Sequence, residues 1–146
     1  MHPYNSGCTF KYQNGVDLQR NYGFQFGVDD IGSSSDPCSD NYRGPSAFSE
    51  PETQAIRNFL SAWSNIKVAI NFHAYGNYMI HPFNFDSTST QYLQSNFSNA
   101  AQFYQELIEN GAPTDTFMNS TNSSYRLNGD TSDYMLYQHG IFAFSP

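Results

Sequence analysis

The sequence has few basic residues. Lys and Arg together number 6 in 146 residues, against 13 acidic residues, so the formal net charge is −7. Nucleic-acid phosphates are bound by clustered Lys and Arg, so this composition argues against a nucleic-acid partner. No apolar run approaches the about 20 residues that span a bilayer, and we expect no membrane partner. The first residues, Met1-His2-Pro3-Tyr4, lack the features of a signal peptide, so either a leader was removed or the chain begins inside a longer protein.

The common catalytic and nucleotide-binding motifs are also missing. The sequence contains no G-x-S-x-G, no phosphate-binding G-x-x-x-x-G-K-S/T and no dinucleotide-binding G-x-G-x-x-G. It has neither H-E-x-x-H nor H-x-x-E, and His73, His81 and His139 fall on separate predicted elements. Motifs of this kind therefore assign no chemistry to the chain.

Cysteine is scarce, with one residue at position 8 and one at position 38. This spacing is not that of a metal site, so Cys8 and Cys38 form either a disulfide or two free thiols. Three N-x-S/T sequons, at Asn96, Asn119 and Asn122, favour an oxidising secretory compartment. We expect a glycosylated protein that is secreted or resides in a vacuole or lysosome.

Apolar residues make up 38% and aromatic residues 17% of the chain, which is the composition and length of one globular domain. The run from Ile66 to Phe72 predicts a strand buried on both faces, with His73 at its end. The pattern also predicts a helix with Ser49 as its N-cap and with Ile56, Phe59, Leu60 and Trp63 on one buried face. Further helices are predicted over about 89–110 and 131–138, further strands over 15–21, 77–81 and 140–144, and loops over 22–49 and 114–128.

Five ordered stretches resemble the zinc carboxypeptidases of the carboxypeptidase A and B type. They occur in the family's order and near its spacings. They are Gly15-Val16-Asp17-Leu18-Gln19-Arg20-Asn21-Tyr22, residues 33–45, Phe48-Ser49-Glu50-Pro51-Glu52-Thr53, Ile70-Asn71-Phe72-His73-Ala74-Tyr75 and Thr131-Ser132-Asp133-Tyr134. The resemblance implies an α/β fold: three α/β/α layers around a twisted mixed β-sheet of the phosphorylase/hydrolase-like kind, incomplete here. Residues 1–146 would be the central to C-terminal part of one peptidase catalytic domain, truncated at both ends.

The resemblance also implies a function. A metallocarboxypeptidase hydrolyses the C-terminal peptide bond of peptides or proteins with a water activated by one Zn²⁺ ion. His73 matches the last zinc ligand, but the family's upstream H-x-x-E is missing, because the only upstream histidine, His2, has Asn5 three residues later. The general-base glutamate is expected directly after Pro146, so no catalytic residue lies in the chain and we expect it to be inactive alone. A monomer is expected.

Other matching positions are implied to bind substrate. Arg20 matches the arginine that pairs with the terminal carboxylate, a task suited to its planar, bidentate guanidinium. Gln19 replaces the asparagine that precedes this arginine in the family, which changes the reach of the amide. Tyr125 matches the mobile tyrosine that closes over substrate, and Tyr75 would lie at the rim of the cleft.

Ser132 matches the floor of the family's side-chain specificity pocket. A carboxylate there would select C-terminal Lys or Arg, and Ser132 supplies none. Asp130 lies two residues earlier and is expected to face the same pocket, which would then accept apolar side chains and tolerate basic ones. Cys8 and Cys38 match the family's disulfide around the same segment.

Two other hypotheses compete with the enzyme. The first is a non-catalytic peptide-binding protein of the same fold, which has kept the substrate groove and lost the zinc site. The second is an unrelated secreted α/β domain in which His73 has a structural role.

Overall fold

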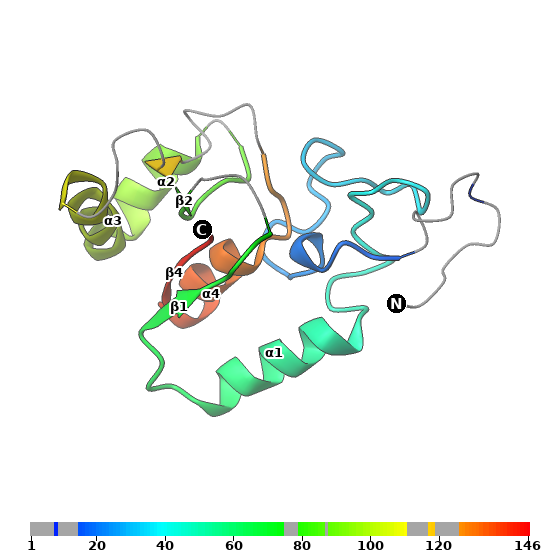
Figure 1. The fold of residues 1–146 in the computed structure, drawn as a ribbon, viewed down its shortest axis with the longest axis horizontal. Helices are drawn as coiled ribbons and strands as arrows, with labels where there is room; N and C mark the ends of the chain where they lie inside the picture. Colours follow the sequence, from blue (N-terminus) through cyan, green and yellow to red (C-terminus); the bar gives the residue numbers. More distant parts are fainter. Residues whose placement is uncertain (1–7, 9–14, 75–78, 87, 111–116, 119–125) are drawn as a thin grey trace.

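The computed structural model describes residues 8, 15–74, 79–86, 88–110, 117–118 and 126–146 (Figure 1). Helices and strands alternate along this part of the chain, as the α/β prediction requires. In chain order they are the 3-10 helix η1 (Leu18–Arg20), α1 (Pro51–Ala62), β1 (Val68–Ile70), β2 (Met79–Ile80), α2 (Ser89–Asn96), α3 (Ser98–Asn110), β3 (Phe117–Met118), α4 (Thr131–His139) and β4 (Phe142–Phe144).

The strands form two parallel pairs, β1 with β4 and β2 with β3, which are joined by one antiparallel bridge. β1 runs parallel to β4, with Val68 opposite Phe142 and Ile70 opposite Phe144. Directly after β4, Ser145 forms an antiparallel bridge to Ile80 of β2, and two backbone hydrogen bonds of 2.8 Å close it. β2 in turn runs parallel to β3. Two parallel strand pairs and one antiparallel bridge are therefore present among the described residues, which is consistent with the expected incomplete α/β domain.

Helix α4 forms where the sequence predicts it and lies beside β4 (Figure 1). Asp130 is its N-cap, and Gly140 ends it in the left-handed conformation, with φ of +64°. The core joins α4 and β4 to the aromatic side chains of the surrounding loops and helices. Its buried members are Tyr22, Phe24, Leu60, Phe83, Phe85, Leu93, Ala100, Tyr104, Tyr134, Met135, Leu136, Ile141 and Ala143.

The prediction that the strand before His73 is buried on both faces is wrong. β1 has only three residues, and Val68 and Ile70 keep 50% and 47% of their surface exposed, while Phe72 is 82% exposed. Within the described part of the chain, β1 pairs with β4 alone. An apolar run shows that a strand could bury both of its faces. Here the described residues leave the side chains of Val68 and Ile70 about half exposed, and only one edge of the strand is paired.

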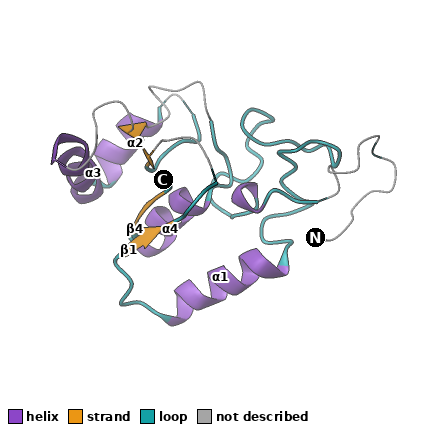
Figure 2. Ribbon diagram, in the orientation of Figure 1, coloured by secondary structure: helices purple, strands orange, loops and turns teal. Residues whose placement is uncertain are grey.

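Helix α1 confirms the predicted range but not the predicted burial. Its N-cap is Glu50, not Ser49. Figure 2 shows α1 at the lower edge of the molecule, and Phe59 and Trp63 are 52% and 56% exposed. Only Thr53 and Leu60 of this helix are buried. Its apolar face is thus largely uncovered by the described residues.

Two further segments differ from the prediction. Residues 15–21 do not form a strand, because the Asp17 side chain accepts a hydrogen bond of 3.0 Å from the Gln19 N–H and caps η1 instead. The single helix predicted over 89–110 is divided at Phe97, whose φ and ψ are −137° and 52°. The break places the Phe97 ring 5.2 Å from the Phe83 ring, so aromatic packing accompanies the loss of helical continuity.

A disulfide joins Cys8 to Cys38, with their Cα atoms 5.4 Å apart, so the disulfide alternative is confirmed. It holds Cys8 to the long loop 22–49, in which the described backbone forms no helix or strand. In the part of the chain that the structure describes, no helix has the length and apolarity needed to cross a bilayer.

His81 predicts a pH dependence of stability. It is 3% exposed, stacks on Tyr104 at 4.7 Å, and lies with Nδ1 2.6 Å from the Pro82 carbonyl oxygen. Burial lowers the pKa of His81 below its usual 6.5. The unfolded chain then binds the proton more tightly, so stability should fall as pH decreases below about 6.5, by at most about 1.4 kcal/mol per pH unit.

Thermal unfolding followed by circular dichroism at pH 7.5 and 5.5 tests this. The variant His81→Phe keeps a ring against Tyr104 and should lose less stability on acidification than the natural sequence. His139→Gln removes a far less buried imidazole and should keep most of the pH dependence. If the melting temperatures of His81→Phe and the natural sequence fell by the same amount between pH 7.5 and 5.5, His81 would not be the source of the pH dependence.

Candidate functional site

Arg20, the last residue of η1, is buried although it carries a charge. It is 6% exposed, and its Nε lies 3.8 Å from Asp17 Oδ2. Nε is also among the buried side-chain atoms for which the described residues supply no hydrogen-bond partner. A buried guanidinium with an unused donor is suited to binding a carboxylate, since the desolvated group gains most from a charged partner.

Gly129 allows the segment before α4 to lie against Arg20. Its carbonyl oxygen accepts a hydrogen bond of 2.9 Å from the Tyr22 N–H, and its φ is +71°. A Cβ atom at this position would lie 2.3 Å from the Arg20 carbonyl oxygen, so a side chain has no room. This close approach brings the next residue, Asp130, into the neighbourhood of the arginine.

Two buried carboxylates follow at the start of α4. Asp130 Oδ2 accepts hydrogen bonds from the N–H groups of Ser132, at 2.8 Å, and Asp133, at 3.2 Å. Burial raises the pKa of Asp130, and the charge of Arg20 and the hydrogen bonds from the Asp133 and Ser132 N–H groups oppose this rise. Burial and the nearby Asp130 raise the pKa of Asp133 well above its usual value, while the Asn84 N–H opposes the shift.

Gln19, His73 and Thr131 form a second cluster. The Thr131 hydroxyl donates to Gln19 Oε1 at 2.5 Å, and Gln19 Nε2 lies 3.1 Å from His73 Nε2. The backbone N–H of His73 donates to the Pro146 carbonyl oxygen at 3.3 Å. Residues from η1, from the segment after β1 and from the start of α4 thus meet at one place.

Neutral polar groups lie next to this cluster. Asn71 Nδ2 donates to Ser132 Oγ at 2.7 Å, and Ser132 Oγ lies 3.1 Å from Ser145 Oγ. Ser132 and Ser145 are 2% and 7% exposed. The three side chains present hydroxyl and amide groups with no formal charge.

The structure thus brings Gln19 to His73, and Arg20 to Asp130. Ser132 follows Asp130 in the first turn of α4, but the Asp130 carboxylate is turned to the helix N-terminus as its cap. The predicted residues Tyr75 and Tyr125 lie outside the described residues. Sequence analysis missed Thr131, Asn71 and Ser145; Asn71 could have been found, because it precedes His73 by two residues and so shares a side of the extended chain.

The described residues do not supply a set of zinc ligands. No group of three or more His, Cys, Asp or Glu side chains among them is placed to hold a metal ion. His73 is exposed and its Nε2 faces an amide, not a carboxylate or a second imidazole. This part of the chain alone therefore does not fit a zinc site with three protein ligands.

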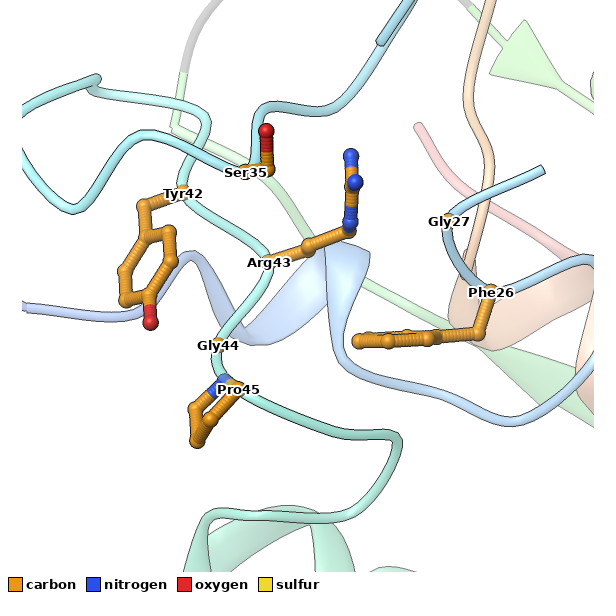
Figure 3. A pocket seen from close by; sticks show the side chains of 7 residues that line it. All are labelled: Phe26, Gly27, Ser35, Tyr42, Arg43, Gly44 and Pro45. Atoms are coloured by element: carbon orange, nitrogen blue, oxygen red, sulfur yellow. The ribbon is translucent and has the colours of Figure 1, made fainter. Parts of the chain in front are cut away.

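A cavity of about 290 Å³ lies elsewhere, between Phe26 and Pro45 (Figure 3). In Figure 3 the Tyr42 ring and the Arg43 side chain leave the backbone on opposite sides. Arg43 Nη1 donates to Asp30 Oδ1 at 2.6 Å, to Ser33 Oγ at 3.1 Å and to the Asp29 carbonyl oxygen at 3.3 Å. This arginine is engaged in holding the loop together, in contrast to Arg20.

The described elements define an α/β domain with parallel strand pairs and a buried arginine among polar groups. A family model described as zinc carboxypeptidase matches residues 2–146. Carboxypeptidase B of Astacus astacus is 32% identical over 128 residues, which are 87% of this chain and 42% of that protein. Human carboxypeptidase A5 is 48% identical over 69 residues, 47% of this chain and 15% of that protein.

A solved structure of bovine thrombin-activatable fibrinolysis inhibitor, in complex with tick carboxypeptidase inhibitor, is similar with a TM-score of 0.70 and 27% identity. The match covers 99% of this chain and 48% of that one. The chain thus spans less than half the length of these relatives. It belongs to the zinc carboxypeptidase family.

Asp133→Asn tests the buried carboxylates. Asp133 Oδ2 accepts from the Asn84 N–H at 3.1 Å, while Oδ1 has no hydrogen-bond partner within the described residues. Burial raises the pKa of Asp133 in the folded state, so the folded protein resists losing this proton. The free energy of unfolding therefore falls as pH rises and the carboxyl group ionises. The asparagine keeps one acceptor and removes the charge, so we expect about 1–2 kcal/mol more stability at pH 7.

Urea unfolding at pH 7 and pH 4 measures the difference in unfolding free energy between Asp133→Asn and the natural sequence. This difference should be smaller at pH 4, because Asp133 binds a proton more readily there. Asp40→Asn, on an exposed residue, is the matched control and should change stability little at either pH. A less stable Asp133→Asn protein at pH 7 would mean that the fold requires the carboxylate.

Proposed function

We propose that this chain is the central to C-terminal part of the catalytic domain of a metallocarboxypeptidase, a protease that removes the C-terminal residue of peptides. Membership of the family supports the reaction class. The single observation that carries the proposal is Arg20, buried beside the cluster that contains His73, with an Nε donor that no described residue uses. Peptides and proteins with a free C-terminus are the proposed substrates.

Arg20 is proposed to pair with the terminal carboxylate, with Gln19 next to it in the sequence. Ser132 forms part of the floor that receives the C-terminal side chain, with Asp130 nearby. Tyr75 and Tyr125 complete the proposed substrate-binding residues, at the rim of the cleft and over the substrate. The uncharged group of Asn71, Ser132 and Ser145 supports a pocket that does not require a basic side chain.

One Zn²⁺ ion is proposed for the complete domain. His73 would be one ligand, and a histidine and a glutamate outside this chain would be the others. The proposed reaction is hydrolysis by a zinc-activated water, with a glutamate directly after Pro146 as general base. The hydrogen bond from the His73 N–H to Pro146 supports that position, because the next residue would begin beside His73.

The whole protein is proposed to be a monomer that is secreted or delivered to a vacuole or lysosome. The disulfide supports passage through an oxidising compartment. Asn96, the first sequon, is exposed at the end of α2, where a glycan could be attached without disturbing the core. Asn119 and Asn122 lie outside the described residues.

Arg20→Gln tests the proposed function in the complete protein that carries this chain. Loss of the charged hydrogen bonds to the substrate carboxylate should lower kcat/KM on a peptide with a free C-terminal Phe by about 10–100-fold. The loss should appear mainly in KM. Lys67→Gln removes an exposed cation elsewhere and should leave kcat/KM unchanged.

The same peptide with an amidated C-terminus is the second control, and the natural protein should not hydrolyse it. Equal hydrolysis of the acid and amide peptides would contradict a carboxypeptidase. Binding of the acid peptide that depends on Arg20, without any hydrolysis, would instead identify the non-catalytic peptide-binding protein.

Side-chain preference is tested with peptides that end in Phe and in Arg. We expect the natural protein to cleave the Phe peptide faster and the Arg peptide measurably, since Asp130 is a buried carboxylate two residues before Ser132. Asp130→Asn should then reduce hydrolysis of the Arg peptide selectively. No measurable cleavage of the Arg peptide would remove Asp130 from the pocket.

A further inference from the structure

The segment directly before the N-cap of α4, residues 126–129, is held against Arg20 on one of its sides. The Gly129 carbonyl oxygen accepts a hydrogen bond of 2.9 Å from the Tyr22 N–H. Gly129 also lies so close to the carbonyl group of Arg20 that no side chain fits between them. The position of this segment is therefore coupled to the position of the backbone that carries Arg20.

The other side of the segment is bonded to a loop that is distant in the sequence. Asn128 is 0% exposed, and its Nδ2 donates to Asp29 Oδ1 at 2.8 Å and to the Ile31 carbonyl oxygen at 2.9 Å. A Cβ atom at Gly32 would collide with the Arg126 carbonyl oxygen, so the loop lies directly on the segment. Asp29 and Asn128 are 99 positions apart in the chain.

The direction of the Asn128 amide follows from its two partners. Both are acceptors, a carboxylate oxygen and a carbonyl oxygen, and only the nitrogen of the amide can donate to them. Asp29 Oδ1 also accepts from the Ile31 N–H at 2.9 Å, so one oxygen atom joins the loop to the segment. The Asp29 carbonyl oxygen accepts from Arg43 Nη1 at 3.3 Å, which ties Asp29 to the rest of its loop.

The contact between Asp29 and Asn128 leaves one buried polar atom without a partner. Asn128 Oδ1 has no hydrogen-bond partner among the described residues, and the same holds for Arg20 Nε and Asp133 Oδ1. A buried acceptor that is not used destabilises the fold, so a residue that only filled space would avoid it. The three residues lie at the start of α4 or against the segment before it, which favours a role in the site.

We propose that Asp29 is a positioning residue for binding of the substrate carboxylate: through Asn128 it holds Gly129 against Arg20, and so keeps the guanidinium in one orientation before substrate binds. The role of Arg20 in this statement rests on the proposed function, whereas the contact between Asp29 and Asn128 does not. Without the contact, Arg20 must be ordered when substrate binds, and the entropy lost at that step weakens binding. The reacting groups are not affected, so KM changes and kcat does not.

Kinetics of the complete protein on a peptide with a free C-terminal Phe test the proposal. Asp29→Ala removes the acceptor and should raise KM about 3–10-fold, the effect of ordering one side chain, while kcat stays within about twofold. Asp29→Asn keeps an oxygen that can accept from Asn128, so its KM should stay within about twofold of the natural value. Asp40→Ala removes an exposed carboxylate of the same loop and is the matched control, with no change expected.

The partner residue provides a second set of variants. Asn128→Leu removes the amide at similar size and should raise KM as much as Asp29→Ala does. The double variant should raise KM no further, because both side chains act through one contact. Hydrogen exchange at the Tyr22 N–H, which donates to Gly129, should be faster in all three variants. Exchange at the Gln54 N–H in α1 should not change, which reports that the fold is intact.

Faster exchange at Tyr22 with an unchanged KM would mean that the contact is only structural, and would overturn the proposal. An equal rise in KM for Asp29→Asn and Asp29→Ala, or a further rise in the double variant, would also overturn it. If the natural protein binds the peptide without hydrolysing it, the proposed reaction is wrong, and the dissociation constant replaces KM in each comparison. If it binds the free acid no better than the amidated peptide, the carboxylate role of Arg20 fails, and the role of Asp29 fails with it.

Discussion

The cap that Asp130 places on α4 is the interaction on which the rest of the site depends. Its carboxylate holds the N–H groups of Ser132 and Asp133, so the first turn of the helix has one fixed geometry. From that turn Thr131 reaches Gln19, and Ser132 reaches Asn71 and Ser145. One capped helix end therefore orients residues from three other segments.

The position of this cap has an energetic cost. Asp130 and Asp133 are 3% and 1% exposed, and two carboxylates so deeply buried disfavour each other's ionisation. Arg20 offsets part of this cost for Asp130, because it is the largest of the opposing influences on that carboxylate. The arginine proposed to bind substrate thus also supports the helix cap, which links the stability of α4 to the charge of the site.

Local signals in the sequence predicted some elements and not others. α4 was predictable because Asp130 at its start and Gly140 at its end are themselves the cause of its boundaries. β1 was predictable as a strand but not as an exposed one, because burial depends on what packs against it. The strand predicted over 15–21 failed because one side chain, Asp17, caps a turn of 3-10 helix. No Pro or Gly marks the break at Phe97.

The site was predictable to the same extent. Arg20 and His73 were selected because each lies in a stretch that resembles the family. The contact between Gln19 and His73 was not predictable, since no local rule relates residues 54 positions apart. Asn71 could have been predicted, because side chains two residues apart lie on the same side of an extended chain. Thr131 gained its importance only from the contact of α4 with η1, and Ser145 only from the contact of α4 with the residue after β4.

The exposed side of β1 has a thermodynamic consequence. Val68 and Ile70 lie on a strand that pairs only with β4 within the described residues, and Phe72, which follows it, is exposed as well. Phe59 of α1 and Trp63 at the end of that helix are also exposed. Any polypeptide that paired with this strand would bind the folded form and not the unfolded one. Its binding energy would then be added to the free energy of folding, so the melting temperature would depend on the concentration of that partner.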